Sequence, residues 1–209
     1  ISIYAQHGHD IEALQLFEEM MHCGVKPNEA TFVSVLKVCV GLRDLRKGKF
    51  IHHCIVDFGF ESHVVNGNVL LDVYGRCGSM EDSCVMFNKI SHPDTITWNT
   101  IIDGLAQHGN PKKALECFEK MKQENVIVDS TTFLGVLSAC NHAGLVGEGW
   151  HHFSSMNYVH HISPTIEHYA YMIDILGTSR HLEATTNFLQ KLHDEPSLSS
   201  WMVILSACL

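Results

Sequence analysis

The sequence predicts an all-α fold built from stacked pairs of helices. Residues 1–48 match residues 102–149 at 17 of 48 positions without a gap, so the chain contains a long internal repeat. Within that repeat, apolar residues recur at helical spacing in short segments that are separated by turn-forming residues. Strand-like alternation and Asn-Gly hairpin signals are almost absent. Short helical pairs of this kind cannot bury their apolar faces alone, so neighbouring pairs must stack and share one core.

The unit predicted over 95–129 shows the design most clearly. Its first helix carries an apolar stripe at helical spacing, formed by Ile96, Trp98, Ile101, Ile102 and Leu105. His108-Gly109-Asn110 ends this helix, and Pro111 suits the first turn of the next. The second helix has its own stripe, formed by Ala114, Leu115, Phe118 and Met121. Two amphipathic helices joined by a short turn therefore make one unit.

The rest of the chain divides in the same way. The predicted segments are a truncated unit 1–28, then 29–63, 64–94, 95–129, 130–165 and 166–197, followed by the start of a further helix over 198–209. The lengths of the five complete units are 35, 31, 35, 36 and 32 residues. Asp10 and Ser79 are the candidate N-caps of the second helices in the first and third segments.

Composition limits the classes of function. The chain has 209 residues, 14 Lys and Arg against 23 Asp and Glu, and a formal charge of −9, whereas a polyanion binder normally shows a basic stripe. Clusters of basic residues such as Arg43–Lys49 could still form a local basic face. No apolar run approaches the length of a bilayer span, so no membrane partner is expected. Because the sequence starts inside a helical unit without Met, we expect it to be a fragment that lacks its targeting segment.

Cysteine and histidine patterns do not indicate a metal, a cofactor or a catalytic centre. The eight cysteines include no Cys-x-x-Cys pair, and Cys39 and Cys140 share one repeat position, as reduced core thiols would. The adjacent His pairs among the 16 histidines point apart on a helix, which does not suit zinc. His181-Leu182-Glu183 and His193-Asp194-Glu195 match half of the zinc deaminase motif, but no Pro-Cys-x-x-Cys follows. The fragment is therefore not expected to be an enzyme.

Several segments carry a family resemblance. Thr97–Gly104 and Ala114–Met121 look like the two helices of a pentatricopeptide repeat, and Gly24–Asn28 looks like its closing segment. The Trp-Leu-Gly-Tyr pattern of tetratricopeptide units is missing. The alternation of unit lengths resembles the plant subclass built from pure (P), long (L) and short (S) repeats, and Trp201–Cys208 resembles the opening of its post-repeat E extension. This resemblance implies a right-handed α-solenoid superhelix of tetratricopeptide-like helical pairs.

The resemblance also implies sequence-specific binding of single-stranded RNA, one base per unit. In the family, the fifth and the last residue of a unit contact the base edge, which here gives Asn68 with Asp94 and Asn99 with Asp129. Both are Asn–Asp combinations that favour uracil in the family. Asn28 closes the first unit, whose fifth residue precedes the sequence. Val65 and Ile96, the second residues of their units, would stack against the base face.

Other units offer less readable combinations. The long repeats pair Val33 with His63 and Leu134 with Thr165, and the last unit pairs Ala170 with Ser197, so their fifth residues lack base-edge chemistry. Without the repeat, Asn68 and Asn99 would be interpreted as surface or helix-capping amides.

The expected biological setting follows from the same resemblance. The parent protein would be a specificity factor for C-to-U editing of organellar RNA, in the mitochondrion or the chloroplast. Its partners would be single-stranded organellar RNA and either editing-complex proteins or a downstream deaminase domain. The alternative is a helical scaffold for protein–protein interaction without RNA readout, which the acidic balance and the uncoded long repeats favour.

Overall fold

The computed structural model describes residues 1–60 and 64–178, and within these ranges the chain forms eleven α-helices and no strand. The all-α class predicted from the sequence is confirmed. The chain divides into two compact units, Ile1–Gly104 and Leu105–Leu209. Each unit is described by itself below, and the division falls within helix α7 (Thr95–Gln107).

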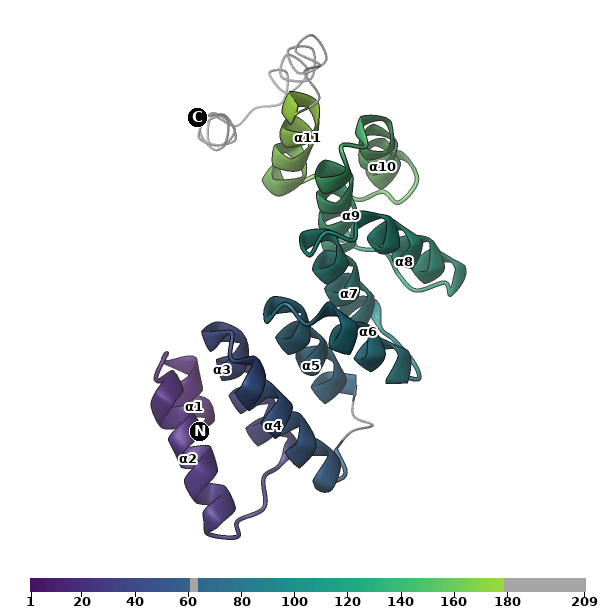
Figure 1. Cartoon of the computed structure of the whole chain (residues 1–209). Helices are drawn as coiled ribbons and strands as arrows, with labels where there is room; N and C mark the ends of the chain where they lie inside the picture. The colour runs from purple at the N-terminus through teal and green to yellow at the C-terminus, as the bar shows by residue number, and fades with distance from the viewer. Residues whose placement is uncertain (61–63, 179–209) are drawn as a thin grey trace. The chain divides into compact units, whose positions relative to one another are not determined.

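The first unit is organised around helix α3 (Glu29–Leu42). This helix packs against α1 (Ser2–Gln6), α2 (Asp10–His22), α4 (Leu45–Asp57) and α5 (Val64–Arg76), as Figure 1 shows. Helix α5 in turn packs against α4 and α6 (Met80–Lys89). The first helix of one pair therefore lies between the first helices of the pairs before and after it.

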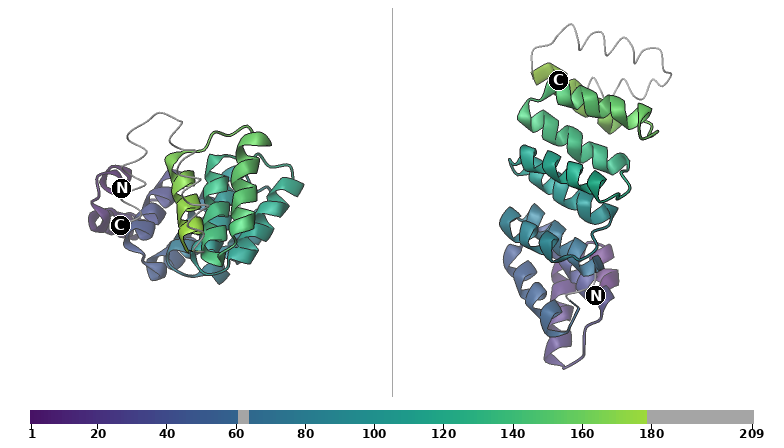
Figure 2. Two further views of the ribbon diagram at one scale, coloured as in Figure 1. Left: turned by 90° about the horizontal axis from the view of Figure 1, so that it is seen from above. Right: turned by 90° about the vertical axis from the view of Figure 1, so that its right-hand side faces the viewer.

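The second unit repeats this scheme with helix α9 (Ser130–Ala143) at its centre. Helix α9 packs against α8 (Pro111–Gln123), α10 (Val146–Tyr158) and α11 (Ile166–Thr178), and α10 also packs against α11. The view from above in Figure 2 shows the green helices of the second unit side by side. None of the described helices is long and apolar enough to cross a bilayer.

The two units bury matching aromatic side chains. In the first unit, the ring of Phe32 on α3 lies edge-on to Phe17 on α2, with 6.1 Å between centroids. In the second, Phe133 on α9 meets Phe118 on α8 at 5.8 Å in the same T-shaped arrangement. All four side chains are buried. The internal repeat detected in the sequence thus corresponds to a repeated packing of aromatic rings between helices.

Two glycines lie in close contact with the following helical pair. Gly48 lies on α4, and a Cβ added to it would sit 2.6 Å from Cγ1 of Val73 on α5. Gly149, at the same repeat position on α10, faces Ile175 on α11, and its added Cβ would sit 3.0 Å from Cδ1. A larger residue at Gly48 would force a shift of Val73 or of the two helices, whereas at Gly149 the end of the Ile175 side chain would have to move by a few tenths of an ångström.

The predicted helix starts are only partly correct. Pro111 is the first residue of α8, as expected. Asp10, however, is the first residue of α2, where His9 is the N-cap and no side chain caps the helix. Ser79 is the N-cap residue of α6, as expected, but its hydroxyl donates to the Asp82 carboxylate at 2.6 Å and accepts no hydrogen bond from a backbone N–H of the first turn. The bond from the hydroxyl to the ionised Asp82 carboxylate is a charge-assisted hydrogen bond.

The repeat boundaries stay predictions, although helices α3, α5, α7, α9 and α11 begin at the first residues of the predicted units. The second half of the unit 166–197, including His181-Leu182-Glu183, lies outside the described residues. The same holds for the segment 198–209.

Candidate nucleic-acid interface

The closing residue of a predicted unit is also the N-cap of the following helix. The Asn28 side chain accepts a hydrogen bond from the backbone N–H of Thr31 at 2.9 Å. The Thr31 hydroxyl accepts one from the backbone N–H of Asn28 at 3.4 Å. Asp129 and Thr132 form the same capping box with distances of 2.9 and 3.1 Å. These reciprocal bonds satisfy backbone N–H groups that would otherwise lack a partner at the start of a helix. Each closing side chain is therefore fixed in place by backbone geometry.

The same capping box forms at the start of α7 and extends to a third side chain. The Asp94 carboxylate accepts a hydrogen bond from the backbone N–H of Thr97 at 2.8 Å, and the Thr97 hydroxyl accepts one from the backbone N–H of Asp94 at 3.2 Å. Asn68, on α5, donates from Nδ2 to Oδ1 of Asp94 at 3.2 Å. The structure thus brings the predicted pair Asn68–Asp94 together. Its role in reading a base stays a prediction.

Asn68 is not a helix cap. It is the fifth residue of α5, and its side chain is half-buried. The alternative interpretation of Asn68 as a helix-capping amide is therefore wrong, because the closing residues of the units, and not their fifth residues, cap the helices. A sequence signal for this existed: Asn28–Thr31, Asp94–Thr97 and Asp129–Thr132 share the spacing of a capping box.

The charge of Asp94 decides how the Asn68 amide is oriented. Partial burial pushes the pKa of the Asp94 carboxyl upward, but hydrogen bonds from Thr97 and Asn68 outweigh this and hold that pKa below its usual value. The carboxylate is therefore ionised at neutral pH and can only accept hydrogen bonds. It must face the NH₂ group of Asn68, which leaves the amide oxygen toward Thr97.

The two residues predicted to stack on a base are exposed. Val65 on α5 is 54% exposed and Ile96 on α7 is 63% exposed, although both helices are otherwise packed into the fold. A solvent-facing β-branched side chain at the second position of a helix adds nothing to the core. Such a side chain offers an apolar surface to a ligand, which suits a base face.

The other predicted positions are less informative. Asn99 lies in the first compact unit and Asp129 in the second, so their pairing stays a prediction. Asn28 is exposed and caps α3. Val33 and Leu134, the apolar fifth residues, are half-buried. His63 and Ser197 lie outside the described residues.

One cap was not anticipated from the sequence. The Thr165 amide donates to Nδ1 of His168 at 3.1 Å, so histidine replaces the threonine found in the other caps. Its Nε2 lies 2.9 Å from the Ser130 carbonyl oxygen, which fixes the proton on Nε2. Burial lowers the pKa of His168 more than the bond to Ser130 raises it, so the ring is neutral. A lone histidine at this repeat position gives no recognisable sequence signal.

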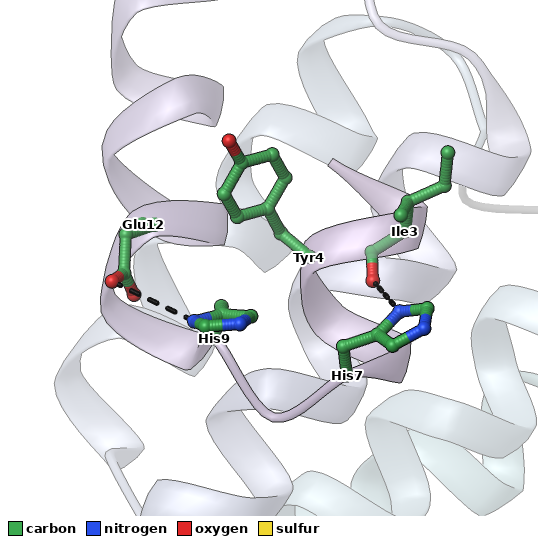
Figure 3. Close-up of a pocket in the computed structure, with 5 residues that line it drawn as sticks. All are labelled: Ile3, Tyr4, His7, His9 and Glu12. Atoms are coloured by element: carbon green, nitrogen blue, oxygen red, sulfur yellow. Dashed lines mark hydrogen bonds and ion pairs between the residues drawn. The ribbon is translucent and has the colours of Figure 1, made fainter.

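A shallow pocket lies between α1 and α2, lined by Ile3, Tyr4, His7, His9 and Glu12 (Figure 3). His9 approaches Glu12 at 3.8 Å, and both side chains are more than half exposed. Tyr4 occupies the repeat position of Leu105, which is buried. Tyr4 itself is exposed, and no ligand is assigned to the pocket. In the described ranges, no cluster of His, Cys, Asp or Glu could hold a metal ion.

Comparison with known families gives matches along most of the described chain. The model described as "PPR repeat family" matches residues 93–142, "Pentatricopeptide repeat domain" matches 1–42, and "PPR repeat" matches 68–91. The chain belongs to the pentatricopeptide repeat (PPR) family. The matched segments include Asn28, Asn68, Asp94, Asn99 and Asp129, the side chains described above.

Similar PPR proteins occur in Arabidopsis thaliana. A mitochondrial pentatricopeptide repeat-containing protein is 40% identical over 205 residues, covering 98% of this chain and 32% of the relative. The chloroplastic PPR protein CRR2 is 39% identical over 210 residues, covering 100% of this chain and 32% of the relative. The chain thus spans about a third of the length of these relatives.

Solved structures of PPR proteins share the fold. The crystal structure of PPR10 from maize aligns with a TM-score of 0.68 and 23% identity, covering 98% of this chain and 30% of PPR10. PPR10 in complex with an 18-nt psaJ RNA element aligns at 0.73 with 19% identity, covering 92% and 28%. The PPR domain of Arabidopsis protein-only RNase P 1, in complex with tRNA, aligns at 0.63 with 16% identity, covering 86% and 97%. The chain therefore has the PPR helical-repeat fold.

Proposed function

We propose that this chain binds single-stranded RNA sequence-specifically and does not itself catalyse a reaction. The observation that carries the proposal is the Asn68–Asp94 pair, a half-buried amide oriented by an ionised carboxylate at the junction of two repeats. Exposed apolar side chains at Val65 and Ile96 support it. The RNA-bound structures of PPR10 and RNase P 1 support the same ligand class.

The chemistry of the pair favours uracil. One N–H of Asn68 bonds to Asp94 and its carbonyl oxygen contacts Thr97, which leaves one further N–H and one carbonyl lone pair. Uracil presents acceptors at O2 and O4 on either side of the N3–H donor, so it can both accept from and donate to the oriented amide. Stacking of the base on Val65 or Ile96 would hold its edge at the amide.

The finer proposal concerns the parent protein. Unit lengths of 35, 31, 35, 36 and 32 residues support membership of the plant subclass with pure, long and short repeats. On this basis the parent protein is a specificity factor for C-to-U editing. Partners are organellar RNA and editing-complex proteins or a downstream deaminase domain. Two relatives are named as mitochondrial and chloroplastic proteins, which supports an organellar location.

Binding of the full 209-residue chain to short RNAs tests the proposal. The probes are adenosine decamers with two adjacent central uridines, of which either can be changed to cytidine. We expect Asn68→Ala to remove the uridine preference at one of the two bases, roughly tenfold in Kd, because one oriented bidentate contact is lost. Asn99→Ala should do the same at the other base.

Asn88→Ala is the matched control, because Asn88 is an exposed amide on α6 of the same predicted repeat. It should change neither base preference nor affinity. A wild-type chain that binds no RNA, or binds all decamers equally at every salt concentration, would instead favour the protein-interaction scaffold.

A further inference from the structure

The side chain of Asn68 is held from two sides, and one of its partners lies in the following repeat. Oγ1 of Thr97 lies 2.6 Å from Oδ1 of Asn68 and 2.7 Å from Oδ1 of Asp94. Thr97 is the third residue of the predicted unit 95–129, and its side chain is fully buried. It therefore never faces a ligand, although it touches both residues of the proposed base-reading pair.

The single proton of the Thr97 hydroxyl can serve either acceptor. Asp94 Oδ1 already accepts hydrogen bonds from the Thr97 amide and from Asn68 Nδ2. Oγ1 of Thr97 lies at almost the same distance from both acceptors, and two oxygens as close as 2.6 or 2.7 Å without a proton between them would repel. The hydroxyl proton therefore lies between the two acceptor oxygens and holds the amide oxygen of Asn68 at Thr97, while the hydroxyl oxygen remains an acceptor for the backbone N–H of Asp94.

These contacts determine which end of the amide points where. Rotating the Asn68 amide by half a turn exchanges its donor and its acceptor without changing its shape. Cytosine carries a donor at N4 and an acceptor at N3, the reverse of uracil at O4 and N3–H. An amide free to rotate would accept either pyrimidine, so discrimination between them requires a fixed orientation. Asp94 specifies the position of the NH₂ group, and Thr97 specifies the position of the oxygen.

We propose that Thr97 is a positioning residue that sets the uracil preference of Asn68, so that the base is specified by three side chains from two successive repeats. This inference rests on the proposed function, because it concerns the same base-reading pair. It adds that the specificity of one repeat depends on the third residue of the next.

The test compares Thr97→Val with Thr97→Ser in the full chain, using the decamers with adjacent uridines or cytidines. Valine keeps the shape of threonine but cannot donate, whereas serine keeps the hydroxyl. We expect Thr97→Val to lower the preference for uridine over cytidine about two- to tenfold, the effect of one hydrogen bond. The loss should be confined to the base that Asn68→Ala identifies. Thr97→Ser should retain the preference.

Thr31→Val is the matched control for loss of the cap itself. Thr31 forms the same capping box with Asn28, and its hydroxyl does not belong to the Asn68 site. Both valine variants should lose similar stability in thermal melts, but only Thr97→Val should change the preference at the Asn68 base. Unchanged preference in Thr97→Val, with a wild-type chain that does prefer uridine, would overturn this inference and leave the proposed function intact. A wild-type chain without any preference would overturn both.

Discussion

Replacing Gly48 by alanine tests the close packing that joins successive repeats. The added Cβ would lie 2.6 Å from Cγ1 of Val73, whereas carbon atoms in ordinary contact lie about 3.5–4.0 Å apart. Val73 is fully buried and β-branched, so its side chain cannot rotate away without further clashes. Helices α4 and α5 must therefore separate by roughly 1 Å.

The expected magnitude combines two opposing effects. Overpacking of a buried contact costs about 1–3 kcal/mol, and alanine is about 1 kcal/mol more favourable than glycine inside a helix. Gly147→Ala isolates the second effect, because a Cβ at this exposed glycine of α10 meets nothing within 4 Å. The free energy of unfolding of Gly48→Ala should therefore fall about 1–3 kcal/mol below that of Gly147→Ala.

Guanidinium denaturation followed by far-UV circular dichroism measures both variants. Because the units of a repeat array can unfold separately, hydrogen exchange of the α4 and α5 amides should show where stability is lost. Adding Val73→Ala to Gly48→Ala should recover part of the loss, giving a favourable coupling energy. Equal stabilities of Gly48→Ala and Gly147→Ala, or no coupling to Val73, would refute the described packing of α4 on α5.

Two further predictions concern the described helices. Burial, followed by the charges of His151 and Lys122, lowers the pKa of His152 to about 4 from its ordinary 6.5. Between pH 6.5 and pH 4 the unfolded chain therefore binds a proton at His152 that the folded chain does not bind. This lowers the free energy of unfolding as the pH falls from 6.5 toward 4, by up to about 1.4 kcal/mol per pH unit. His152→Ile introduces the residue that α4 carries at the same repeat position, Ile51. In this variant the denaturation midpoint should depend less steeply on pH in acid, and an unchanged slope would refute the assignment of the acid dependence to His152. Asn28→Ala should lower the stability of α3 by about 1 kcal/mol through loss of its N-cap, and Asn28→Asp should not, as hydrogen exchange of the first turn of α3 would reveal.

The sequence predicted the helical pairs well because their signals are local. Apolar spacing, Pro111 and the turn glycines each act within a few residues, and α7 and α8 begin where the pattern places them. The caps were harder to predict, because Asp10 is the first residue inside α2, and the side chain of Ser79, although it is at the N-cap of α6 as expected, bonds to another group. Ser79, for example, donates to Asp82 at 2.6 Å.

The candidate site was predicted as a pair and is described as a triad. The family resemblance, which implies base contact by the fifth and the last residue of a unit, selected Asn68 and Asp94, which lie far apart in sequence and are hydrogen-bonded at 3.2 Å. Thr97 was not selected, because its contact with Asn68 depends on the packing of α5 near the start of α7. Such a contact across repeats leaves no periodic signal, whereas its capping role with Asp94 does.

Equilibrium binding of the wild-type chain to two RNAs tests the central claim most directly. The probes are the adenosine decamer with two adjacent central uridines and the same decamer with two cytidines, measured by fluorescence anisotropy at fixed salt. If Asn68 with Asp94 and Asn99 with Asp129 each read one base, the uridine decamer should bind more tightly by about 1–3 kcal/mol per position. Equal affinity for the two decamers would contradict the account.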